Sequence, residues 1–220
     1  GGGEEVALSS GGFTLARYVL KPIRKLGRKM RAAYNRAMHP MRRRRALRAI
    51  RSAGSPSRIL FVCHGNICRS PYAEGALRRD LPESLESWIQ CRSAGFIGPN
   101  RSSPPEALEV AAERSVDLSE HRSRLLESAL VRSADLVFVM DRGQRSAIRG
   151  RFRSTEVLLL GDLDPRRPDR RRIRDPIAQP VEVFRSVYER IDRCVGELVR
   201  HLQEHCGPVP GSDVDRPIDG

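Results

Sequence analysis

Hydrophobic residues along most of the chain follow two different periods. Short apolar runs rich in β-branched residues occupy residues 59–62, 136–140 and 157–160, and a weaker one occupies 88–92. Runs of this length are typical of buried strands. Apolar residues at helical spacing lie in residues 71–80, 107–114, 124–131 and 181–205. Alternating strands and helices predict an α/β fold with a parallel sheet in a single domain.

The N-terminal part of the chain has a separate amphipathic pattern over residues 22–39. Apolar positions such as Ile23, Leu26 and Met30 fall on one side of a helix, and Arg and Lys residues fall on the other. Pro22 suits the first helical turn, and Pro40 suits the end of the helix.

Three regions follow from these patterns. Residues 1–57 are expected to form a basic extension, with a disordered Gly- and Ser-rich start, a helix over about 22–39 and a linker at 52–57. Residues 58–206 are expected to form the globular domain. Residues 207–220, rich in Pro, Gly and Asp, are expected to form a flexible tail.

Charge divides the chain at the same place. The net charge of the 220 residues is +13, but residues 1–57 hold 14 basic and 2 acidic side chains, whereas residues 58–220 hold 26 and 25. The high isoelectric point therefore belongs to the extension, and no specific nucleic-acid binding is expected of the domain. No apolar run approaches the roughly 18 residues that a membrane span needs. The five sparsely spaced cysteines indicate reduced thiols and a cytoplasmic location.

The residues with the clearest chemical meaning are 63–70, which read Cys-His-Gly-Asn-Ile-Cys-Arg-Ser between a predicted strand and a predicted helix. Backbone N–H groups in such a loop converge with the positive end of the helix dipole, which makes an anion site. Gly65 permits a tight turn, and Asn66 tolerates a positive φ. Arg69 can hold two oxygens of a phosphate, and Ser70 can donate a hydrogen bond to sulfur. These surroundings favour a thiolate nucleophile at Cys63.

A thiolate that attacks phosphorus also needs an acid for the leaving oxygen. Asp175 is the candidate, because Pro176 restricts it to an extended backbone on a loop before the last helix. A turn residue before proline is the ordinary alternative for an isolated Asp-Pro pair. The preceding residues 162–174 are rich in Arg, which could attract acidic substrates.

These motifs, in this order, resemble the low-molecular-weight protein tyrosine phosphatases over about residues 58–206. The matching segments are 62–74 with the Cys63 loop, Arg92-Ser93-Ala94-Gly95, residues 121–124, residues 135–141 and Asp175-Pro176.

The resemblance implies a four-stranded parallel sheet flanked by helices and a metal-independent phosphatase without a cofactor. It implies Cys63 as nucleophile, Arg69 as transition-state clamp and Asp175 as general acid, acting on phosphotyrosine in a protein substrate. Phosphate would be bound by the remaining loop residues, namely His64, Gly65, Asn66, Ile67, Cys68 and Ser70. It also implies a protective disulfide between Cys63 and Cys68.

Other interpretations remain beside this one. Aromatic residues usually follow the Asp-Pro pair in the family, but Ile177 and Ala178 stand here. Arsenate reductases of the same fold use further cysteines in the middle of the chain, and residues 92–193 contain none. Protein arginine phosphatases tend to carry Thr at the position of Ile67. A binding module with vestigial activity is a further alternative. Zinc binding by Cys63, His64 and Cys68 is disfavoured, since no second Cys/His pair lies nearby.

The basic helix over 22–39 leaves three interpretations open. It could dock on an anionic membrane surface, which would make the protein peripheral to a membrane. It could contact an acidic partner or nucleic acid. It could also be an extension without a function of its own.

Overall fold

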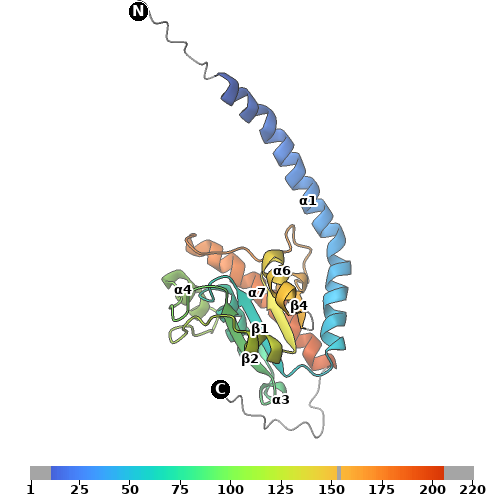
Figure 1. Cartoon of the computed structure of the whole chain (residues 1–220), viewed down its shortest axis with the longest axis vertical. Coiled ribbons are helices and arrows are strands. Elements are labelled where there is room, and N and C mark those ends of the chain that lie inside the picture. The colour runs from blue at the N-terminus through green and yellow to red at the C-terminus, as the bar shows by residue number, and fades with distance from the viewer. Residues whose placement is uncertain (1–10, 153–154, 206–220) are drawn as a thin grey trace, which may run out of the picture.

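The structure is a computed structural model that describes residues 11–152 and 155–205. Its centre is a four-stranded sheet in the order β2-β1-β3-β4, in which all neighbouring strands run parallel. The strands are β1 (Arg58–Cys63), β2 (Gln90–Gly95), β3 (Leu136–Val139) and β4 (Glu156–Leu159). The predicted α/β fold with a parallel sheet is therefore confirmed (Figure 1).

Helices cover both faces of the sheet. They are α1 (Gly11–Ser52), α2 (Arg69–Asp80), α3 (Glu83–Glu86), α4 (Pro105–Ala112), α5 (Ser128–Ser133), α6 (Arg142–Arg151) and α7 (Val181–His205), with a short 3₁₀ helix η1 (Leu160–Asp162) after β4. Alternate residues of the strands point to opposite faces. Ile59, Phe61 and Phe138 pack with α2, α4 and α7, and Leu60, Val62 and Val137 pack with residues of α5 and α6.

Two helices of the domain differ from what the sequence predicts. Residues 124–127 were expected to begin a helix, but Leu125 is extended and bridges Gly95 at the end of β2, so α5 begins only at Ser128. Helix α6 was not predicted, because its sequence holds few apolar residues and many arginines. Burial of Ile148 and a cap from the Asp141 side chain to the Gln144 N–H, at 2.9 Å, stabilise it instead.

The N-terminal helix is longer than its amphipathic pattern predicts. Residues 22–39 belong to α1, but α1 passes through Pro40 and continues to Ser52, so the predicted end at Pro40 is wrong. The physical reason is packing: His39, Ala46 and Ile50 of α1 are buried against the body. The hydrophobic core therefore includes residues of α1 that precede Arg58.

Polar contacts also fix α1 to the body. His39 Nε2 lies 2.7 Å from the Asp164 carbonyl oxygen, Arg43 pairs with Glu197 of α7, and Asn35 Nδ2 donates to the Asp169 carbonyl at 2.8 Å. Gly11 and Gly12, expected to be disordered, are the first helical residues, while the rest of the expected disordered start and the expected tail at 207–220 lie outside the described residues.

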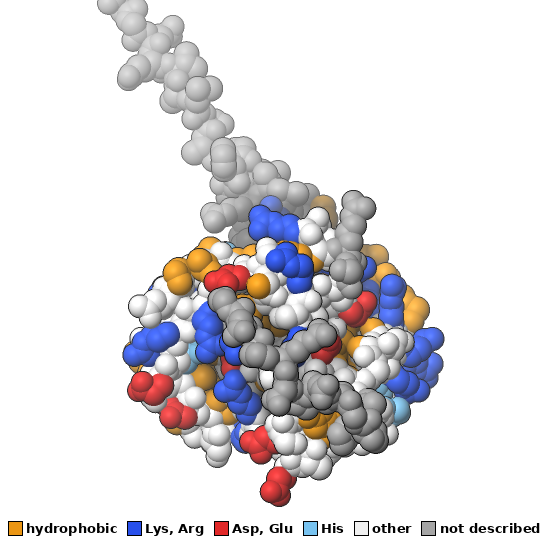
Figure 2. Space-filling view, turned by 60° about the horizontal axis from the view of Figure 1, so that its bottom comes forward, with side chains coloured by type: hydrophobic (Ala, Val, Ile, Leu, Met, Phe, Trp, Pro, Cys, Tyr) orange, Lys and Arg blue, Asp and Glu red, His pale blue; other side chains and the backbone are white. Residues whose placement is uncertain are grey.

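The surface of the body carries mixed charge. Arg side chains are interspersed with Asp and Glu side chains across the face of the body in Figure 2. No helix in the described part of the chain is long and apolar enough to cross a membrane.

Candidate active site

The candidate nucleophile lies where β1 ends. Cys63 is the last residue of β1, and its side chain is buried. Its Sγ accepts a hydrogen bond from the Ser70 hydroxyl at 3.0 Å and another from the Asn66 N–H at 3.2 Å. Hydrogen bonds to sulfur stabilise a negative charge on it.

Asn66 holds the loop between β1 and α2 in shape. It is fully buried and adopts a φ of 49°, as its residue type allows. Its Nδ2 donates to the hydroxyls of Ser70 and Ser93, both at 2.9 Å, and its Oδ1 accepts from the Arg124 N–H at 2.8 Å. The positive φ therefore occurs at Asn66, the residue expected to tolerate it.

Two glycines allow the loop to be approached closely. A Cβ at Gly95 would lie 2.8 Å from the Asn66 backbone nitrogen, and a Cβ at Gly65 would lie 2.8 Å from Arg101 Nη2. The missing Cβ of Gly95 allows the end of β2 to pack against the loop, and the missing Cβ of Gly65 leaves room for the Arg101 guanidinium.

The carbonyl groups of the loop are held from outside. Arg101 Nη2 donates to the Gly65 carbonyl at 2.9 Å, and the Tyr188 hydroxyl donates to the Cys68 carbonyl at 3.1 Å. His121 Nε2 lies 2.7 Å from the Asn66 carbonyl oxygen, and burial lowers the pKa of this imidazole. None of these three side chains was expected in the site, and Arg101 and Tyr188 had no signal in the sequence.

The backbone N–H groups at the start of α2 are free to bind an anion. The first N–H groups of a helix have no partner within the helix, and no side chain caps α2 at Cys68. With the carbonyl oxygens fixed on the outside of the loop, the N–H groups at the start of α2 are available to bind an anion beside Cys63.

Arg69 brings positive charge to the same place. Its guanidinium is 4% exposed, pairs with the Asp175 carboxylate and donates to the Ile173 carbonyl at 3.3 Å. Its Nε is buried and has no hydrogen-bond partner among the described residues. Because a buried donor without a partner is costly, this N–H is suited to an incoming oxygen.

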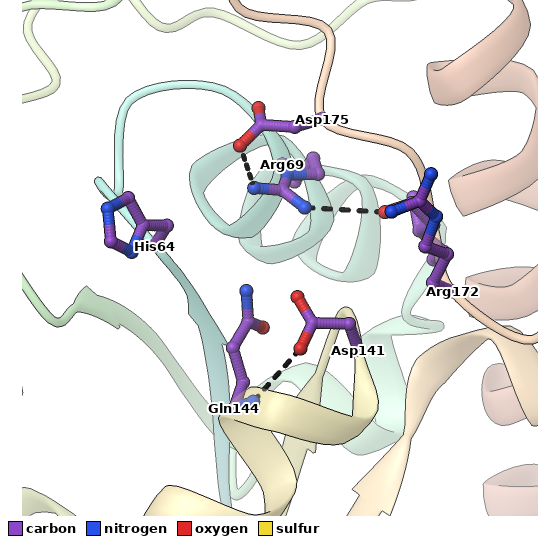
Figure 3. Close-up of a pocket in the computed structure, with 7 residues that line it drawn as sticks. His64, Arg69, Asp141, Gln144, Arg172 and Asp175 are labelled. Carbon is purple, nitrogen blue, oxygen red and sulfur yellow. Dashed lines mark hydrogen bonds and ion pairs between the residues drawn. The ribbon is translucent and has the colours of Figure 1, made fainter.

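A pocket of about 350 Å³ opens over these groups (Figure 3). The predicted residues His64, Arg69 and Asp175 line it together. Its remaining lining residues are Asp141, Gln144, Arg172 and Ile173, to which the sequence analysis assigned no role in the site. Asp141 ends the family-matching segment 135–141, whereas Gln144 was identifiable only as a neighbour of a predicted strand. In Figure 3, Asp175 and Arg69 lie on one side of the pocket, with Asp141 and Gln144 across from them.

Ile177, which stands where the family usually has an aromatic residue, is 44% exposed.

The thiol groups of the described cysteines are all free. Cys63, Cys68, Cys91 and Cys194 are buried, and Cys206 lies outside the described residues. Burial, with the nearby charges of Cys63 and Asp175, raises the pKa of Cys68. The disulfide between Cys63 and Cys68 therefore stays a prediction.

Three residues with possible metal-ligand atoms, His201, Glu204 and His205, lie together at the end of α7 in the described chain. The two imidazole rings stack at 4.3 Å, and Glu204 pairs with Arg200. Their possible ligand atoms lie within 4.8 Å of one another, and the cluster is at the C-terminal end of α7, outside the pocket.

Comparisons with known proteins agree with this geometry. Residues 58–207 match the family model for low molecular weight phosphotyrosine protein phosphatase. A probable low molecular weight protein-tyrosine-phosphatase, EpsP of Ralstonia nicotianae, is 38% identical over 149 residues, which cover 66% of this chain and 95% of the relative. A protein-arginine-phosphatase of Bacillus subtilis is 31% identical over 150 residues, covering 66% and 97%.

Solved structures show the same architecture. The tyrosine phosphatase Wzb from Escherichia coli K30, in complex with sulphate, is 29% identical, with a TM-score of 0.59 over 67% of this chain and 99% of that chain. The described site and the match over residues 58–207 lead to one conclusion. The chain belongs to the low molecular weight phosphotyrosine protein phosphatase family.

Proposed function

We propose that the protein hydrolyses phosphotyrosine in protein substrates through a cysteinyl-phosphate at Cys63. The observation that carries the proposal is the convergence at one loop of three features. The Cys63 sulfur accepts two hydrogen bonds, the start of α2 has no side-chain cap, and the buried Arg69 Nε has no partner among the described residues. Together they suit a phosphate dianion placed directly against a thiolate.

The first chemical step forms the S–P bond. Phosphate oxygens accept hydrogen bonds from the loop amides and from Arg69, and the Cys63 thiolate attacks phosphorus. The bond from phosphorus to the tyrosine oxygen breaks, and Asp175 gives its proton to that oxygen. Asp175 pairs with Arg69 in the structure, so binding of phosphate to the guanidinium would release the carboxyl group for this transfer.

The second step regenerates the enzyme. Asp175, now ionised, takes a proton from a water molecule as the water attacks phosphorus. The S–P bond breaks, inorganic phosphate leaves, and the Cys63 thiolate returns. Asn66 and Ser70 hold the loop and stabilise this thiolate through the hydrogen bonds already described.

The names of several relatives support tyrosine as the substrate residue. The relative named protein-arginine-phosphatase supports phosphoarginine as a second candidate. Since Ile67 stands where the arginine branch tends to carry Thr, phosphotyrosine is the preferred assignment.

The test is hydrolysis of an aryl phosphate in the presence of EDTA by the wild type and by Cys63→Ser. We expect turnover in the wild type and none in the variant, together with trapping of phosphate on the wild-type protein after rapid acid quench. Cys91→Ser is the matched control, because Cys91 is buried on β2 outside the pocket. Turnover that survives in Cys63→Ser, or that disappears with EDTA, would overturn the mechanism.

We propose further that α1 recruits the enzyme to an anionic partner. Support comes from the sequence of α1, which holds 14 Arg and Lys residues and no Asp or Glu. Such a helix is attracted to negative charge whether or not the pocket is occupied.

A further inference from the structure

Helix α1 exposes an apolar face that the body does not cover. Ile23, Leu26, Met30, Tyr34 and Met41 are each between 56% and 65% exposed. Their spacing of mostly three or four residues places them along one side of the helix. Scattered exposed apolar residues are common, but a continuous row on one helix indicates an interaction surface.

This apolar face points away from the body. The residues of α1 that contact the body are Asn35, His39, Arg43, Ala46 and Ile50. At about 100° per residue, His39 lies about 160° around the helix axis from Ile23. The helix thus has two faces. The C-terminal half of α1 buries one face against the body, and the apolar face lies on the opposite side of the helix, where the body does not reach it.

Figure 1 shows that the N-terminal half of α1 projects well beyond the sheet and its covering helices. The apolar face is therefore accessible along the helix, not only at one residue. Side chains of Arg24, Lys29 and Arg31 are exposed on the same projecting segment. At helical spacing, Arg24 and Arg31 lie along one border of the apolar face, and Lys29 lies along the other.

We infer that the apolar face of α1 inserts into the interfacial region of a membrane that contains anionic lipid, while the flanking Arg and Lys side chains contact the lipid phosphates. An apolar row bordered by basic residues is the pattern that such surfaces bind. This inference makes the proposed anionic partner of α1 specific, and it does not depend on the phosphatase reaction.

A second copy of the chain fits the same face poorly. Pairing two α1 helices would place 14 basic residues against 14, with no acidic residue on either helix to compensate. An acidic protein would satisfy the charges, but it would also have to offer an apolar groove along the helix. An anionic lipid surface supplies both negative charge and an apolar layer along the whole length of the helix.

The body would stay next to the membrane in this arrangement. Asn35 and Arg36 bind Asp169, which lies on the same loop as Asp175 and the pocket residue Arg172. The segment that carries the general acid is thus attached to α1 at the base of its projecting half. Substrates held at the membrane would lie within reach of the pocket.

The experiment is co-sedimentation of the full chain with vesicles of phosphatidylcholine mixed with phosphatidylserine, and with vesicles of phosphatidylcholine alone. We expect binding to the anionic vesicles that weakens as salt is added. In the double variant Leu26→Ser, Met30→Ser, binding should fall by about tenfold or more, since the apolar contribution is lost while every charge remains. Arg24→Gln with Lys29→Gln, which removes one basic residue from each border of the apolar face, should weaken it by a similar factor.

The matched control exchanges the two apolar residues as Leu26→Met with Met30→Leu, which keeps the face apolar and should bind as the wild type does. Hydrolysis of a small aryl phosphate, measured on the same samples, should be equal for all these variants, so a failure of the phosphatase proposal would be visible separately.

Three results would overturn the inference. One is equal sedimentation of the wild type and the Leu26→Ser, Met30→Ser variant. Another is a wild-type dimer in analytical ultracentrifugation that is absent in this variant, which would assign the face to a second copy. The third is an absence of vesicle binding at low salt together with binding to polyglutamate, which would assign the helix to an acidic protein.

Discussion

At the scale of single residues, the pairing of Arg69 with Asp175 connects two segments that are 106 positions apart in the chain. Arg69 is positioned by the first turn of α2, and Asp175 by the loop that precedes α7. In the absence of substrate, the proposed general acid Asp175 is thus paired with Arg69, the residue proposed to bind phosphate. The two functions of Asp175, as partner of Arg69 and as acid, can be separated by changing the leaving group.

We predict that Asp175→Asn lowers kcat/KM, which reports the first chemical step, by about 10²- to 10⁴-fold for phenyl phosphate, because an amide cannot protonate the leaving oxygen. The loss should be much smaller for p-nitrophenyl phosphate, whose leaving oxygen needs little protonation. Steady-state kinetics with both substrates measures the difference. Asp169→Asn is the control, since Asp169 lies on the same loop but binds Arg36. An equal loss with both substrates would contradict the role as acid.

The sequence predicts the residues of this site unevenly, and the reason is distance along the chain. Cys63, Asn66, Arg69 and Ser70 lie within one loop, so their spacing alone indicates an anion site with a nucleophile. Tyr188 binds the same loop from 120 positions away, and no local pattern marks it as different from other residues of an apolar helix face. Its role appears only when α7 is packed against α2.

At the scale of elements, α1 shows why an amphipathic pattern can identify a helix and still misplace its end. Pro40 lacks an N–H and is normally found near helix ends. Here tertiary contacts of the following residues outweigh that cost, because Ala46 and Ile50 complete the core against the body. Four consecutive arginines at residues 42–45 interrupt the apolar pattern, so the sequence does not indicate that Ala46 and Ile50 lie on a buried face.

Ile50→Ala should therefore lower the free energy of unfolding by about 2–5 kcal/mol, the usual cost of removing a fully buried Ile side chain. Ile23→Ala, on the same helix but exposed, should change it by about 0.5 kcal/mol or less. Urea denaturation followed by circular dichroism measures both. Equal, small effects would mean that α1 contributes nothing to the stability of the body.

At the scale of the whole molecule, two histidines from different parts of the fold are shielded from solvent, His121 partly and His201 almost completely. His121 supports the Asn66 carbonyl at the active-site loop, and His201 is buried on α7. Burial is the largest cause that lowers the pKa of each imidazole below its ordinary value near 6.5. Both are therefore neutral in the folded protein under conditions where the unfolded chain has already begun to take up protons.

Stability should accordingly fall with pH in the window below the ordinary histidine value. Above about pH 6.5, both histidines are neutral in the folded and unfolded states, so they add no pH dependence. As the pH falls through that value, the unfolded state binds protons before the folded state does, and unfolding becomes more favourable. The carboxylates with lowered pKa values, Glu113 and Asp117, titrate only in more acidic solution.

Urea denaturation at a series of pH values between about 5 and 7.5 measures this slope. Replacing His201 with Asn should flatten the slope, whatever it does to the absolute stability. His121→Asn should flatten it too, and should also reduce turnover, because the Asn66 carbonyl would lose its ring nitrogen partner. A stability that stays level or rises as the pH falls from 6.5 to 5 would show that neither imidazole is held neutral by the fold.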